Sequence, residues 1–328
     1  MEGVFLYNQP EVIMEQYDLE VVRITKGRGA YQCETDQGMK LLKEFRGSAE
    51  RAAFLADILA RLSAAGFETE QIVPAKDGQV LVTEDTGDKF ILKDMITGNE
   101  CSTRSREEMK QAMCLLGRFH RISGSLYDAV PDLMKEGWEG CASQLARHNR
   151  ELVKVKNYVR AKKKKNEFEM KFQEQYPHYM ENAKRVVEQM QTIHLPGECQ
   201  MLCHGDYNQH NAVRTDAGFR MVHFEYMNYR DAVTDMANFM RKMLEKNCWN
   251  ERLGRELVEA YEKERKLLPE ERKELFWLLA YPEKFWKLAN HYYNSNKAWL
   301  SGRNIEKLDK LIAQENDRMR FLQAFAAG

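Results

Sequence analysis

The first third of the chain alternates between short apolar runs and polar turns. Six runs have the composition of β-strands: residues 19–25, 31–35, 39–45, 72–73, 80–83 and 90–94. Turns rich in Gly and Asp separate most of them. Between the third and fourth runs, apolar residues recur with helical spacing over residues 48–65, and Ser48 is placed to cap that helix. The pattern predicts a small sheet with one helix inserted into it.

From residue 105 onwards the apolar spacing is mainly helical. Two helices are expected over residues 140–195, and a closing amphipathic helix over residues 305–325. We therefore predict an α+β fold with two lobes. The β-rich lobe spans residues 1–96 and the mainly helical lobe spans residues 97–328.

One polar loop interrupts the helical part, and its spacing suggests chemistry. His204-Gly205-Asp206 opens the loop, Asn211 follows five positions after the aspartate, and the apolar run 219–224 comes next. Phosphoryl transfer needs an Asp to accept a hydroxyl proton, and an Asn and a second Asp to hold Mg²⁺. Asp206 and Asn211 fit the first two roles, and His204 would orient the loop. The third position, at the end of the apolar run, is His223.

The loop HGDYNQHN resembles the H-G-D-x-x-x-x-N loop of aminoglycoside phosphotransferases and choline-kinase-like enzymes. Residues 231–237 are similar to the D-x-x-x-D-L-A segment of that superfamily. Within it, the chain resembles the CotS family of bacterial spore-coat proteins over nearly its whole length, including the segment from Tyr281 to Trp299. The resemblance implies a two-lobed protein-kinase-like fold, with ATP and Mg²⁺ as ligands. It also implies cytoplasmic synthesis in the mother cell and a place in the spore coat beside other coat proteins.

The resemblance also maps nucleotide-binding positions onto the first lobe. Gly27 and Gly29 either let the backbone approach phosphates or simply form a tight hairpin. The nucleotide-pairing lysine maps to Lys43. Lys40 would lie on the opposite face of the same strand.

The acid that pairs with this lysine is expected on the helix that follows, as Glu50 or Asp57. The stretch that includes Asp94 and Ile96 looks like the hinge between lobes, where backbone groups meet an adenine ring. The alternative is an edge strand leaving the sheet.

His223 divides the functional hypotheses. Mg²⁺ prefers hard oxygen ligands, whereas His223 offers a nitrogen and no negative charge. Glu225 would share its strand face and is the remaining carboxylate. One hypothesis is a degenerate site in a structural or scaffold component of the spore coat. The other is an active ATP-dependent phosphotransferase acting on a small hydroxylated molecule, with Asn211 and Glu225 holding the metal.

Composition narrows the other possibilities. The 328 residues include 50 Lys and Arg and 50 Asp and Glu, and a net charge of zero argues against general nucleic-acid binding. Seven scattered Cys without a C-x-x-C pair fit reduced thiols better than disulfides. No apolar run approaches the length of a membrane span, so no membrane partner is expected. Lys162–Lys165 form either an anion-binding patch or a solvated helix face.

Overall fold

The computed structural model describes residues 10–27, 29–84, 86–294 and 302–326. Trp299 lies outside these residues. The chain forms two compact units, Met1–Cys101 with Gln209–Met227, and Ser102–Asn208 with Asn228–Gly328. The first unit thus takes in residues 209–227, from the end of the polar loop onwards, which the sequence analysis places in the helical lobe. No helix among the described residues is long and apolar enough to cross a membrane.

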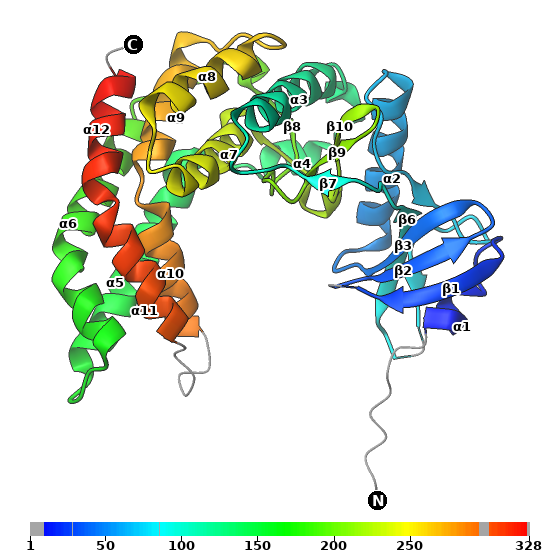
Figure 1. Ribbon diagram of the computed structural model, residues 1–328, viewed down its shortest axis with the longest axis horizontal. Coiled ribbons are helices and arrows are strands. Elements are labelled where there is room, and N and C mark those ends of the chain that lie inside the picture. The colour runs from blue at the N-terminus through cyan, green and yellow to red at the C-terminus, as the bar shows by residue number, and fades with distance from the viewer. Residues whose placement is uncertain (1–9, 28, 85, 295–301, 327–328) are drawn as a thin grey trace, which may run out of the picture. The chain divides into compact units, whose positions relative to one another are not determined.

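The first unit is built on an antiparallel sheet (Figure 1). Its strands are β1 (Val21–Lys26), β2 (Tyr31–Thr35), β3 (Gly38–Glu44), β4 (Ile72–Val73), β5 (Val82–Thr83) and β6 (Lys89–Asp94). Their order is β1-β2-β3-β6-β4, and β5 also pairs with β6. A second sheet has the order β10-β9-β7, from Gly218–Met221, Ala212–Thr215 and Asn99–Glu100. The predicted strands are confirmed, and most of their bounds differ by no more than two residues.

The first sheet has two unlike faces because side chains alternate along each strand. Leu42, Phe90 and Leu92 point to one face, where they pack with Ile13 of α1 (Pro10–Met14) in a buried cluster. Residues at the odd positions of β3 and β6 point to the other face. That other face carries Lys43 and Lys93, described below.

Helix α2 (Ala49–Ala64) begins as predicted. The Ser48 side chain accepts a hydrogen bond from the Arg51 amide, which satisfies one of the free N–H groups of the first turn. Leu55, Leu59 and Leu62 are buried along one stripe of the helix. The helix therefore packs through the face that its apolar spacing indicated.

The second unit is mainly helical. Its helices are α3 (Arg106–Gly124), α4 (Asp132–Glu136), α5 (Gly140–Ala161), α6 (Glu167–Met190), α7 (Val233–Lys246), α8 (Glu251–Glu262), α9 (Pro269–Ala280), α10 (Glu283–Asn294), α11 (Gly302–Ala313) and α12 (Glu315–Ala326). Strands β8 (Gln200–Cys203) and β11 (Asn228–Asp231) form an antiparallel pair. Phe172, Tyr179 and Phe285 stack in a core between α5, α6 and α10. The α+β fold class is confirmed.

The predicted closing helix is wrong in one respect, because the structure divides it into α11 and α12. The break falls at Gln314, whose side-chain amide donates to the carbonyl oxygen of Glu245 at 3.0 Å. Glu315 and Asp317 then provide the acidic first turn that favours the start of a new helix.

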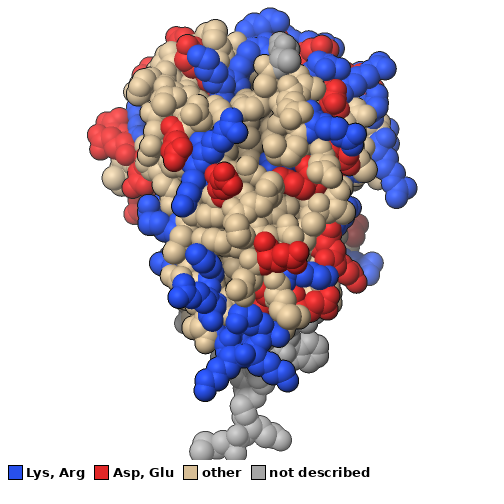
Figure 2. Space-filling model, turned by 90° about the vertical axis from the view of Figure 1, so that its left-hand side faces the viewer, with Lys and Arg blue, Asp and Glu red and all other residues tan. Residues whose placement is uncertain are grey.

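The face of the molecule in Figure 2 carries Lys and Arg side chains interspersed with Asp and Glu. This mixture agrees with the zero net charge of the sequence.

Helices α3 and α8 approach closely at Gly117. A Cβ added there would lie 2.5 Å from the carbonyl oxygen of Tyr261. We expect Gly117→Ala to lower the free energy of unfolding by about 1–3 kcal/mol, since the two backbones must separate. Gly124→Ala is the matched control, because nothing lies within 4 Å of its added Cβ. Urea unfolding measures both, and equal stability of the two variants would contradict the close approach.

Candidate functional site

A buried lysine lies at the centre of the charged side chains of the first unit. The Lys93 side chain is only 1% exposed. Its Nζ lies 2.8 Å from Oε1 of Glu70 and 3.2 Å from Nδ1 of His223, and it also donates to Oε1 of Glu225. An ammonium has three N–H donors. Each of them therefore has an acceptor.

The backbone around His223 is shaped to meet Glu70. His223 is in the left-handed region, with φ 69° and ψ 55°, which is uncommon for a residue other than glycine. This bend turns two successive N–H groups to one carboxylate oxygen. The amides of His223 and Phe224 donate to Oε1 of Glu70 at 2.8 and 3.2 Å. Glu70 thus holds both Lys93 and the backbone of the turn.

The cluster contains two lysines and two glutamates, because Lys43 also lies 3.1 Å from Oε1 of Glu225. Burial alone would lower the pKa of Lys93, but Glu70 and Glu225 outweigh it and hold that pKa above its usual value. Burial opposes ionisation of Glu225, yet Lys93 and Lys43 hold its pKa well below the usual range. The ion pairs are therefore fully formed near neutral pH.

His223 is neutral in this setting. Burial, and then the nearby Lys93 ammonium, lower the pKa of its imidazole. Its Nδ1 must accept from Lys93, so the ring proton is on Nε2. Glu70, His223 and Glu225 could together hold a metal ion, since their ligand atoms lie within 4.8 Å of one another. The Lys93 ammonium already interacts with all three.

The expected pairing of Lys43 with Glu50 is not formed. Glu50 is exposed at the start of α2, where a hydrogen bond with Ser48 lowers its pKa. Asp57 pairs instead with Arg61 on its own helix. The contact from this helix to the His223 region is made by Arg51, which donates to the carbonyl oxygen of Met227.

The other positions predicted to bind nucleotide lie in or next to the strands of the same sheet. Lys40 and Asp94 form an ion pair at 2.7 Å, on the opposite face of β3 from Lys43. Ile96 follows β6 and is half-buried. The hairpin between β1 and β2 closes through a Gly27 N–H bond to the carbonyl oxygen of Ala30, at 2.8 Å. Gly29 adopts φ 74°, a conformation that favours glycine.

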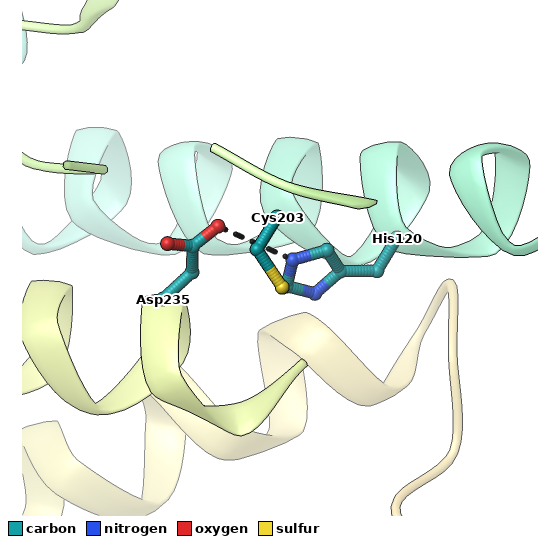
Figure 3. A group of neighbouring side chains, drawn as sticks. All are labelled: His120, Cys203 and Asp235. Atoms are coloured by element: carbon teal, nitrogen blue, oxygen red, sulfur yellow. Dashed lines mark ion pairs between the residues drawn. The ribbon is translucent and has the colours of Figure 1, made fainter. Parts of the chain in front are cut away.

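In the second unit, one carboxylate holds the start of the polar loop. Asp235 on α7 accepts the backbone N–H groups of His204 and Gly205, at 2.5 and 3.0 Å. His120 on α3 and Cys203 on β8 lie beside this carboxylate, as Figure 3 shows. His120 Nε2 is 3.5 Å from the Asp235 oxygen, and His120 Nδ1 is 2.8 Å from the hydroxyl of Tyr261.

His120, Cys203 and Asp235 are residue types that can bind a metal, and all three are buried. However, both Asp235 oxygens are already occupied by backbone donors. Burial raises the pKa of the Cys203 thiol well above its usual value, so the sulfur keeps its proton. The group therefore anchors the loop through the Asp235 carboxylate.

Asp206 follows this anchor and is about half-exposed. Its carboxylate lies 3.3 Å from Nζ of Lys242, whose pKa is lowered by burial. Asp206 also lines a cavity of about 200 Å³ that Arg230, Arg241 and Lys287 help to form. His204 is fully buried, and its Nδ1 accepts the N–H of Asp206 at 3.3 Å.

Asn211 lies in the first unit, just before β9, and is buried. Its carbonyl oxygen accepts the Val222 N–H at 3.1 Å. This bond joins the end of the polar loop to the segment that leads into His223. Asn211, His223 and Glu225 are therefore brought into one unit, whereas Asp206 and His204 belong to the other.

Comparison with known proteins identifies the relatives of this chain. The family model described as "Spore coat putative kinase YutH" matches residues 10–325. The chain belongs to this family. Spore coat protein S of Bacillus subtilis (strain 168) is 23% identical over 309 residues, which cover 90% of this chain and 86% of that protein. The expected relationship to CotS-like spore-coat proteins is confirmed.

Solved structures that resemble this one include a phosphotransferase and a kinase. An aminoglycoside phosphotransferase from Alicyclobacillus acidocaldarius has a TM-score of 0.82 and 16% identity, covering 97% of this chain and 96% of its own. The amicoumacin kinase hAmiN, solved with AMP-PNP and Ca²⁺, has a TM-score of 0.63 and 12% identity, covering 96% and 94%. At these identities the likeness shows the fold. The predicted kinase-like fold is confirmed.

Sequence reasoning did not find Lys93 or Glu70. Lys93 does leave a signal, because it directly follows the apolar run Phe90–Leu92 within the same strand, and the strand is buried there. A lysine in a buried strand needs a carboxylate partner. Glu70 leaves none, since it lies outside any periodic element.

Removal of the Lys93 charge should destabilise the protein strongly. Lys93→Met leaves two buried carboxylates without their main counter-charge, and we expect the free energy of unfolding to fall by about 3–5 kcal/mol. Lys89→Met on the same strand is the control, with an expected change within about 1 kcal/mol. Urea unfolding at pH 7 measures both. Equal losses in the two variants would show that Lys93 does not hold the cluster together.

Proposed function

We propose that this protein is a kinase-like component of the spore coat whose phosphotransfer site is degenerate, and that its role is structural. The observation that carries this proposal is the place of the Lys93 ammonium. It lies among Glu70, His223 and Glu225, the group whose ligand atoms could otherwise hold a metal.

Mg²⁺ binding at this position would meet two obstacles. Mg²⁺ needs oxygen ligands and net negative charge, and the His223 ring supplies neither. The Oε1 atom of Glu225 already serves both Lys43 and Lys93. A divalent ion would have to displace a buried ammonium and leave it without a partner, at a cost of several kcal/mol.

The proton-accepting position is also engaged. A general base must be able to take a proton from the acceptor hydroxyl. Asp206 has its carboxylate in an ion pair with Lys242, which occupies one of its two oxygens. On this proposal, nucleotide binding is weak and independent of Mg²⁺.

An active phosphotransferase is the second candidate. Among the described residues, Oε2 of Glu225 is buried and has no hydrogen-bond partner. A metal could use this atom together with Asn211. Solved relatives by fold hold nucleotides, such as AMP-PNP with Ca²⁺ in hAmiN and ADP in a spectinomycin phosphotransferase. On this alternative, ATP and Mg²⁺ bind and a small hydroxylated molecule accepts the phosphate.

The structural role rests on family membership. The family is described as a spore coat putative kinase, and the matched relative from Bacillus subtilis is named a spore coat protein. We propose other coat proteins as the partners of this chain. Phosphate transfer is not needed for such a role, because a scaffold acts through its surface.

Thermal unfolding with ATP, with and without Mg²⁺, tests the degenerate site. We expect no Mg²⁺-dependent rise of the midpoint in the unmodified protein. We expect a rise in the Lys93→Met/His223→Asp variant, which frees the position and supplies a carboxylate, because a ligand of the native state raises the midpoint by mass action. Lys89→Met/His223→Asp is the control and should show no rise. A Mg²⁺-dependent rise in the unmodified protein would overturn the proposal.

The structural role has its own test in a spore-forming host that lacks the gene. Asp206→Asn removes the proton acceptor and keeps the shape of the side chain. We expect this variant to restore the extractable coat-protein profile as fully as the unmodified gene does. If Asp206→Asn behaves like the deletion while the protein accumulates normally, the active phosphotransferase is the better account.

A further inference from the structure

A groove with an apolar floor runs between α5 and α6 in the second unit. Its volume is about 480 Å³. Phe172, Tyr176 and Met180 form the floor, and each is at most 7% exposed because it also packs into the core. The floor is therefore fixed by packing beneath it, and a ligand would meet a preformed surface.

The rim of the groove is cationic. Lys156 and Arg160 lie on α5, and Lys184 lies on α6. Among the described residues, none of these three forms an ion pair with a carboxylate. The ammonium of Lys156 lies 5.1 Å from the centre of the Tyr176 ring, so it is held over the floor. Glu181 is the one acidic residue in the lining.

The basic run of the sequence extends this rim. Residues 154–165 contain seven Lys or Arg and no acidic residue. Part of the run is structural, since Lys162 pairs with Glu169 at 2.5 Å and Lys165 donates to the carbonyl oxygen of Lys162. Lys163 and Lys164 are exposed. Figure 2 shows the face that includes α6, where Lys and Arg side chains gather towards the lower end.

A proline adds a backbone acceptor to the lining. Pro177 lies within α6 and has no N–H. The carbonyl of Gln173 therefore lacks the amide that it would normally bind one turn later. Both residues line the groove. A polar donor of a ligand could bind this carbonyl.

We propose that the groove binds an acidic linear segment of a partner protein, with one aromatic or aliphatic side chain seated on the floor. Carboxylates flanking that side chain would meet Lys156, Arg160 and Lys184. The partner rests on the proposed coat role, since a scaffold needs such a surface. The groove itself is separate from the Lys93 cluster, which belongs to the other unit.

A protein segment fits this surface better than a nucleic acid does. Single-stranded nucleic acids stack their bases on exposed aromatic faces. Tyr176 is only 7% exposed and the Lys156 ammonium lies over its ring, so the ring has no free face for a base. The zero net charge of the chain also provides no broad electrostatic field for a polyanion.

Fluorescence anisotropy with the full chain tests the proposal. The probe is a labelled nine-residue peptide in which glutamates flank a central Leu-Tyr pair. We expect saturable binding below about 1 mM at low salt. The Lys156→Glu/Arg160→Glu/Lys184→Glu variant should bind at least about tenfold more weakly, because its rim repels the peptide. Replacing the central Leu-Tyr by Gly-Gly should weaken binding to the unmodified protein as well.

The matched control reverses three exposed cations elsewhere, in Arg106→Glu/Lys246→Glu/Lys266→Glu, and should bind as the unmodified protein does. Equal losses in both triple variants, no dependence on Leu-Tyr, or no saturable binding would each overturn the proposal. Tighter binding of oligo-uridine or anionic vesicles through the same three cations would also overturn it. The triple groove variant should show the same unfolding midpoints with ATP and Mg²⁺ as the unmodified protein. A failure of the peptide-binding proposal can therefore be distinguished from a failure of the degenerate-site proposal.

Discussion

The first unit depends on one buried ammonium. Lys93 comes from the sheet, Glu70 from the segment after α2, and His223 and Glu225 from the chain that returns after the polar loop. A buried charge must be paired, so these three segments are obliged to meet. The left-handed bend at His223 follows from this requirement, because it brings two amides to the Glu70 oxygen that Lys93 also uses. Fold and site are held by the same contacts.

The second unit also contains a buried charged group, the carboxylate of Asp235, whose oxygens accept hydrogen bonds. Asp235 fixes the backbone of His204 and Gly205, and the neutral His120 lies beside it. The start of the loop is therefore held in place by contacts within this unit, although our account assigns it no catalysis. The Asp235 carboxylate stabilises the fold whether or not the loop is catalytic. Its presence is therefore compatible with a structural protein.

The sequence predicts the parts of the structure that have local causes. Ser48 caps α2 because its side chain bonds an amide three residues away, and strand β2 follows from alternation within five residues. The pairing of Lys43 with Glu225 cannot be predicted from neighbouring residues in the sequence. Helix position indicates Glu50 or Asp57, but the ion pair is made by Glu225, which is distant in the sequence. The ion pair of Lys93 with Glu70 likewise joins residues that are distant in the sequence. The sequence reveals the residues of the polar loop, such as Asp206 and Asn211, because they lie close together in the chain. The ion-pair network around Lys93 depends on tertiary contacts, which the sequence does not reveal.

We infer that the ammonium of Lys93 takes the place of a metal ion in the first unit. Anomalous diffraction from crystals grown with Mn²⁺ and AMP-PNP tests it most directly, because Mn²⁺ can be located independently of the protein atoms. Our account predicts no manganese peak within bonding distance of Glu225, and Lys93 still bonded to Glu70, Glu225 and His223. A manganese ion bound to Glu225, with the Lys93 ammonium displaced, would contradict the account.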